Sequence, residues 1–183
     1  MSQTQAPVAP MPPKARPKNA NAALVLNDGT VFWGKGVGVE GVALGEVCFN
    51  TSITGYQEIM TDPSYAGQLI TFTFPHIGNT GTNPEDIETV TPAARGCILR
   101  ADITEPANWR AAEHFDKWMR EANLVGISGV DTRRLTRHIR EFGAPGGTII
   151  HLPAGQDIDI EALNTMSNSF PGIEGMDLAK EVM

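Results

Sequence analysis

Four arginines between residues 133 and 140 form the densest group of chemically active side chains in the sequence. They are Arg133, Arg134, Arg137 and Arg140. Their spacing places them on one short helix, and guanidinium groups pair with carboxylates through two parallel hydrogen bonds. This group therefore suits carboxylate pairing or a subunit interface. A solvated basic face that balances an acidic domain is an equally good interpretation.

Histidine and cysteine residues offer less for catalysis. His76 lies in a glycine-rich loop, but neither a nucleophile nor a carboxylate adjoins it, so packing or backbone capping is favoured over acid–base chemistry. Cys48 and Cys97 are expected to be buried free thiols, because a cytoplasmic chain is kept reduced. The sequence holds no C-x-x-C or H-E-x-x-H spacing, and we predict no metal site.

A glycine pattern and a proline turn are the remaining local signals. Gly36–Gly41 matches G-x-G-x-x-G, but a strand-like run, Val42–Val47, follows it where a dinucleotide site needs a helix. Glycines at a strand bend or bulge are the better prediction. In the turn Thr61–Tyr65, the proline holds Asp62 extended and can present the hydroxyl of Ser64 at the surface. The residues by themselves predict a turn, and a ligand role is the lesser alternative.

The elements that position these residues are mostly strands first and helices later. Leu24–Trp33 predicts a hairpin around Asp-Gly, and alternation over Ile70–Phe74 predicts a strand of a half-exposed sheet. Helical spacing follows in Ala112–Ala122 and between the N-cap Asp131 and Gly143, and Gly147–Leu152 predicts another strand. The predicted class is α/β, with helices on one side of a sheeted or barrel-like β unit.

Composition separates a tail from a domain. The chain has 183 residues, a mass of 19.7 kDa and a formal charge of −7. Residues 1–21 hold five prolines, three basic residues and no acid, which predicts a disordered arm. The remainder has a net charge of −10, which disfavours nucleic-acid binding. No apolar run approaches the roughly 20 residues of a membrane span and no signal peptide is seen, so we predict no membrane partner and a cytoplasmic location.

Several longer motifs occur together in one order. They are Gly45–Glu58, Thr61–Tyr65, Pro75–Asn79, Asp131–Arg137, Phe170–Gly172 and Gly175–Val182. This series resembles the N-terminal domain of the small subunit of glutamine-dependent carbamoyl-phosphate synthase, over about residues 23 to 182. The resemblance implies a layered β/β/α swivelling domain. It divides the chain into the arm 1–21, the domain 22–155, and a C-terminal helix and linker, 156–183, toward an absent class I glutamine amidotransferase domain.

The resemblance also implies a function in a heterodimer. In this family the small subunit hydrolyses glutamine, and ammonia passes to a large subunit that makes carbamoyl phosphate from bicarbonate and ATP for pyrimidine and arginine synthesis. The N-terminal domain docks on the large subunit and borders the glutaminase site, where the serine corresponding to Ser64 contacts glutamine. The Cys-His-Glu machinery lies in the absent domain. The resemblance thus implies that this chain alone is inactive, with no catalytic residue and no cofactor, ATP and Mg²⁺ being used by the large subunit.

Two alternatives belong to other classes. A stand-alone protein-binding module with the same fold needs no large subunit. A nucleic-acid-binding protein acting through the arginine helix is the other alternative, and the negative charge of the domain argues against it.

Overall fold

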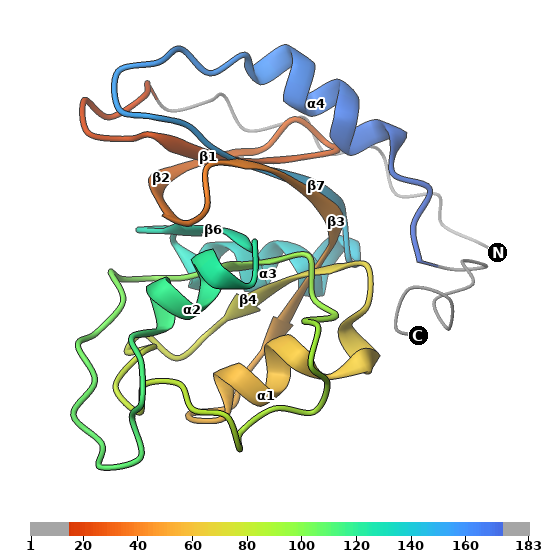
Figure 1. The fold of residues 1–183 in the computed structure, drawn as a ribbon. Coiled ribbons are helices and arrows are strands. Elements are labelled where there is room, and N and C mark those ends of the chain that lie inside the picture. The colour runs from red at the N-terminus through yellow and green to blue at the C-terminus, as the bar shows by residue number, and fades with distance from the viewer. Residues whose placement is uncertain (1–14, 174–183) are drawn as a thin grey trace, which may run out of the picture.

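A closed barrel of seven strands forms the centre of the computed structural model, which describes residues 15–173 (Figure 1). The strands are β1 (Ala22–Leu26), β2 (Val31–Gly38), β3 (Gly41–Asn50), β4 (Gln68–Phe72), β5 (Gly96–Ile98), β6 (Val125–Ser128) and β7 (Gly146–His151). Their order around the barrel is β1-β2-β6-β5-β4-β3-β7, and β7 pairs with β1 to close it. The helical elements are α1 (Tyr56–Thr61), the 3-10 turn η1 (Pro63–Tyr65), α2 (Phe115–Glu121), α3 (Thr132–Phe142) and α4 (Ile160–Ser169).

The predicted N-terminal hairpin is confirmed as the antiparallel pair β1 and β2. The Asp28 carboxylate accepts a hydrogen bond of 2.8 Å from the backbone N–H of Thr30, and Gly29 has a φ of 84°. A glycine suits this turn because a residue without Cβ adopts positive φ at little cost. From β3 through β4 and β5 to β6 the pairing is parallel, so the barrel is a mixed sheet.

Alternate side chains of the strands fill the barrel, and α3 packs against the same core. In β1, Leu24 and Leu26 are fully buried in this central cluster, which also contains Leu135 and Ile139 of α3. The helix predicted between Asp131 and Gly143 is confirmed, since the Asp131 carboxylate accepts from the Arg134 N–H at 3.0 Å. The side of α3 that carries arginines is therefore held on a rigid, buried base.

Helices also cover the outer faces of the strands. Ile70 of β4 packs in a second cluster with Met60 of α1 and Met119 of α2. Helix α4 covers another part of the barrel (Figure 1). Its Leu163 packs in a third cluster with Val25 of β1. The α/β class and the barrel-like β unit with helices alongside are thus confirmed.

The prediction of a half-exposed strand over Ile70–Phe74 is wrong. Strand β4 ends at Phe72, and Thr71 is 0% exposed. By strand alternation Thr71 shares the face of Leu69, which lies in the barrel core, while Ile70 and Phe72 face α1 and α2. A parallel strand of a barrel that is also covered by helices has no solvent face, whatever its pattern predicts.

The ordered domain begins before Ala22. Arg16 donates two hydrogen bonds to the Ala20 carbonyl at 2.8 and 3.0 Å, and Asn21 donates to the Leu152 carbonyl at 3.1 Å. The earlier part of the predicted arm, and the motif Gly175–Val182, lie outside the described residues. Within residues 15–173, none of the helices is long and apolar enough to cross a membrane.

Candidate functional site

Ser64 stands on an exposed turn between α1 and β4. Asp62 is extended, with φ −69° and ψ 122°, as the following proline requires, and its carboxylate accepts from the Ser64 N–H at 2.8 Å. Among residues 15–173, no side-chain or backbone group forms a hydrogen bond with the Ser64 hydroxyl. The predicted turn is confirmed, and it leaves this hydroxyl available to a ligand; a glutamine contact at Ser64 stays a prediction.

The turn is tied to the end of β3 by a tyrosine that the sequence analysis did not single out. The Tyr65 hydroxyl accepts a hydrogen bond from the Asn50 amide at 2.9 Å. The side-chain oxygen Oδ1 of Asn50 in turn accepts from the backbone N–H of Ser52 at 2.7 Å. Because Tyr65 also packs against the cluster under α1 and α2, the backbone of Ser64 is fixed by two separate anchors, Asp62 and Tyr65.

The structure divides the four predicted arginines into two groups. Arg134 does not line the groove that the other three share; it is half-buried, with Cζ at 4.9 Å from the centroid of the Phe32 ring, in a second cavity that Arg133 and Arg137 also line. Arg133, Arg137 and Arg140 are exposed and line one groove of about 620 Å³. This cationic groove is lined by Thr51, Thr73, Pro75, Arg100, Thr132, Arg133, Thr136, Arg137 and Arg140.

The cationic groove includes an arginine that the helical spacing does not reveal. Arg100 comes from the loop after β5 and lies 3.6 Å from the Asp131 carboxylate. Arg140 lies over the Phe49 ring, with Cζ at 5.6 Å from the centroid. None of the described residues that line the groove is acidic. The arrangement is chemically suited to hold carboxylates or phosphates.

The G-x-G-x-x-G segment covers the end of β2, a bend at residues 39–40 and the first residue of β3, which confirms the predicted strand bend; β2 and β3 do not pair with each other. Gly36 lies against the ring of His151, and a Cβ on Gly36 would come within 1.9 Å of the ring atom Cδ2. The Nδ1 atom of His151 is 3.0 Å from the Val39 carbonyl oxygen, which can only accept, so Nδ1 carries the hydrogen. The glycine makes room for a buried histidine and not for a phosphate.

Neither cysteine has the environment of a nucleophile. Cys97 is fully buried in β5, while Cys48 in β3 is only half-buried, so the prediction of buried free thiols holds for the first and in part for the second. Burial is the main cause that raises the pKa of each thiol to about 12. Both are therefore protonated at neutral pH, whereas the reactive form of cysteine is the thiolate.

The structure gives no sign of catalytic chemistry at the histidine loop. His76 is exposed and makes an edge contact with Phe74, the ring centroids being 5.9 Å apart. In the part of the chain that the structure describes, no three His, Cys, Asp or Glu side chains come together as metal ligands would.

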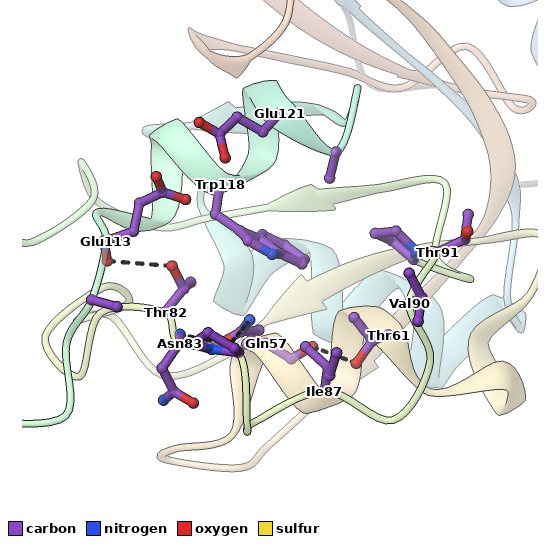
Figure 2. A pocket seen from close by; sticks show the side chains of 14 residues that line it. Gln57, Thr61, Thr82, Asn83, Ile87, Val90, Thr91, Glu113, Trp118 and Glu121 are labelled. Atoms are coloured by element: carbon purple, nitrogen blue, oxygen red, sulfur yellow. Dashed lines mark hydrogen bonds between the residues drawn. The ribbon is translucent and has the colours of Figure 1, made fainter.

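A pocket of about 580 Å³ lies between α1, the loop of residues 82–93 and α2. Figure 2 shows Trp118 pointing from α2 into this pocket. The polar groups at its base are used internally. Gln57 exchanges hydrogen bonds of 2.8 and 2.9 Å with the backbone of Asn83, and the Thr61 hydroxyl accepts from the Glu88 N–H at 2.9 Å. These contacts hold the loop on α1.

The two carboxylates on the rim of that pocket are also partnered. Glu113 pairs with Lys117, and Glu121 lies 3.4 Å from the same ammonium group. Among residues 15–173, the pocket therefore presents mainly the Trp118 surface and the exposed Val90, and neither of its two carboxylates is unpaired and able to act as a base.

Taken together, the structure defines a mixed α/β barrel domain with an exposed serine turn and a cationic groove. The family described as "Carbamoyl-phosphate synthase small chain, CPSase domain" matches residues 24–149. This chain belongs to that family.

Individual relatives agree with the match. The carbamoyl phosphate synthase small chain of Rhizobium meliloti (strain 1021) is 58% identical over 163 residues, which are 87% of this chain and 40% of that protein. The small chain of Ruegeria pomeroyi is 56% identical over 161 residues, 88% of this chain and 41% of the relative. The small chain of Brucella anthropi is 50% identical over 186 residues, which cover 100% of this chain and 44% of the relative. The chain thus spans less than half the length of these relatives.

Proposed function

We propose that this chain is the N-terminal part of a carbamoyl-phosphate synthase small subunit, which docks on the large subunit and borders the glutaminase site. The observation that carries the proposal is the match of residues 24–149 to the small-chain family. In the complete enzyme, glutamine hydrolysis would supply ammonia to the large subunit, which makes carbamoyl phosphate with bicarbonate and ATP. The protonated state of Cys48 and Cys97 supports an accessory role for this domain, inactive alone.

Ser64 is the residue proposed to contact glutamine. Its hydroxyl is exposed and unengaged among the described residues, while its backbone is held by Asp62 and its neighbour Tyr65 is held by Asn50. A polar group on a turn that is already rigid loses little conformational entropy when a ligand binds. This arrangement supports a role in positioning the substrate amide or amino acid group.

The proposed partner is the large subunit, and the arginines of α3 are the proposed contact. The geometry supports Arg133, Arg137 and Arg140 in this role, because all three are exposed along the cationic groove. Arg134 instead stacks on Phe32. We propose that this chain binds no cofactor and that ATP and Mg²⁺ are bound by the large subunit.

The test is Ser64→Ala in the complete two-subunit enzyme. We expect a KM for glutamine raised by about ten-fold, the equivalent of one lost hydrogen bond of about 1.4 kcal/mol, with ammonia-dependent synthesis unchanged. Ser169→Ala is the matched control, since Ser169 is an exposed serine at the end of α4. Equal glutamine kinetics for wild type and Ser64→Ala would refute the role of Ser64.

A further inference from the structure

The cationic groove concentrates positive charge on a chain that is acidic as a whole. The formal net charge is −7, yet four of the 14 Lys and Arg residues line this one groove. They are Arg100, Arg133, Arg137 and Arg140. Since the groove has no acidic side chain among its lining residues within 15–173, these like charges repel one another unless an anion lies between them.

Two of these arginines have no counter-charge in the described part of the chain. Neither Arg133 nor Arg137 forms an ion pair or a hydrogen bond through its side chain with any of residues 15–173. Two carboxylates lie near these arginines: that of Asp131, which is already shared between Arg100 and the Arg134 N–H, and that of Glu141, which lines a second cavity with Arg133 and Arg137. Binding at Arg133 and Arg137 therefore has no internal ion pair to break.

The arginines of the groove form a row on a helix that is held rigidly. Leu135 and Ile139 bury the other side of α3 in the barrel core, so the helix cannot rotate freely. Arg133, Arg137 and Arg140 follow the spacing i, i+4 and i+7, which at about 1.5 Å per residue spreads their Cα atoms over about 10 Å. A single small anion would reach only part of that row. Several carboxylates along an extended or helical segment match the whole of it.

The opposite wall provides uncharged contacts. Thr51 follows β3, and Thr73 and Pro75 follow β4, so the loops after two adjacent parallel strands form this side. Threonine and proline offer hydroxyl groups and apolar surface without a competing charge. A peptide backbone lying in the groove would meet hydrogen-bonding groups on one side and guanidinium groups on the other.

We infer that the cationic groove receives an acidic segment of the large subunit, with Asp or Glu carboxylates paired to Arg133 and Arg137. The inference rests on the proposed function and specifies the chemistry of the partner surface. Charge complementarity of this kind orients the two proteins and accelerates their encounter, and its effect decreases with ionic strength.

The experiment measures association of the complete small subunit with its purified large subunit. The variant Arg133→Gln/Arg137→Gln removes two positive charges. Lys18→Glu changes the net charge by the same amount at an exposed position before β1, and serves as the matched control. We expect the dissociation constant of the double variant to rise about ten-fold, equivalent to about 1.4 kcal/mol, with a weaker dependence on salt. The control variant is expected to bind as wild type does.

The outcomes separate the inference from the proposed function. If the double variant has the unfolding midpoint of wild type and binds the large subunit equally well, the inference is overturned while the proposed function stands. If it binds equally well but has lost binding of inorganic pyrophosphate, the groove is a small-anion site and the inference is likewise overturned. If the wild-type small subunit does not bind the large subunit at all, the proposed function fails, and the inference fails with it.

Discussion

The contact between Gly36 and His151 allows a quantitative test of why the sequence contains G-x-G in β2. Gly36→Ala adds one methyl group. A Cβ at this position would lie 1.9 Å from Cδ2, 2.1 Å from Cγ and 2.3 Å from Nε2 of the His151 ring. Carbon atoms in favourable contact are about 3.5–4.0 Å apart. The distances from the added Cβ to the ring are more than about 1 Å shorter than a favourable contact, so the ring would have to move by about that much.

The surroundings of His151 make that movement costly. The residue is 7% exposed, and its Nδ1–H donates to the Val39 carbonyl at 3.0 Å. Forcing a methyl group into a packed interior costs about 1–3 kcal/mol, and losing a hydrogen bond costs about 1 kcal/mol. We therefore expect Gly36→Ala to lower the free energy of unfolding by about 3 kcal/mol.

A double-mutant cycle identifies the cause. His151→Ala removes the ring and is itself expected to cost about 2–4 kcal/mol. In that background the added methyl group has space, and Gly36 does not have a positive φ, so alanine fits its backbone. Gly36→Ala should then stabilise the protein by about 0.4–1 kcal/mol, a reversal of sign. Urea unfolding followed by circular dichroism measures all four proteins. An equal loss of stability in both backgrounds would refute the steric explanation.

Two further predictions concern the thiols and the serine turn. Because both cysteine pKa values are raised to about 12, the folded chain should react slowly with Ellman's reagent at pH 8 and release two equivalents only on unfolding. Unfolded thiols ionise near pH 8.5, so the stability from keeping them protonated is complete below that pH and decreases above it; stability that rises from pH 8.5 to 10 would contradict this. In the complete enzyme, Tyr65→Phe removes the acceptor for Asn50 and should raise the KM for glutamine by less than Ser64→Ala does, whereas an unchanged KM would show that the anchor is dispensable.

Local signals in the sequence were sufficient for the parts of the fold that depend on neighbouring residues. The Asp28-Gly29 turn and the cap at Asp131 each involve groups within three residues, and both were predicted correctly. The burial of Thr71 could not be predicted in this way, because it depends on the closure of the barrel and on helices from distant segments. An alternating pattern describes the strand but not what covers it.

The candidate site shows the same division. Helical spacing grouped the arginines of α3, but it could not show that Arg134 turns toward Phe32 while Arg100, more than thirty residues earlier, joins the groove. The hydrogen bond between Asn50 and Tyr65 likewise connects β3 to the turn after α1. A tertiary contact of this kind depends on the order of the strands. The residues next to Asn50 and Tyr65 in the sequence do not predict it.

The most direct test of the central claim is to capture the native polypeptide from its source cells with an antibody to this chain, and to measure its intact mass together with glutamine-dependent carbamoyl phosphate synthesis in the captured material. The account predicts a polypeptide about twice 19.7 kDa, since this chain spans only 40% and 44% of the small chains of Rhizobium meliloti and Brucella anthropi, bound to a large subunit and active with glutamine. A native polypeptide of 19.7 kDa without a large subunit and without synthase activity would contradict the account, and would favour a stand-alone protein-binding module.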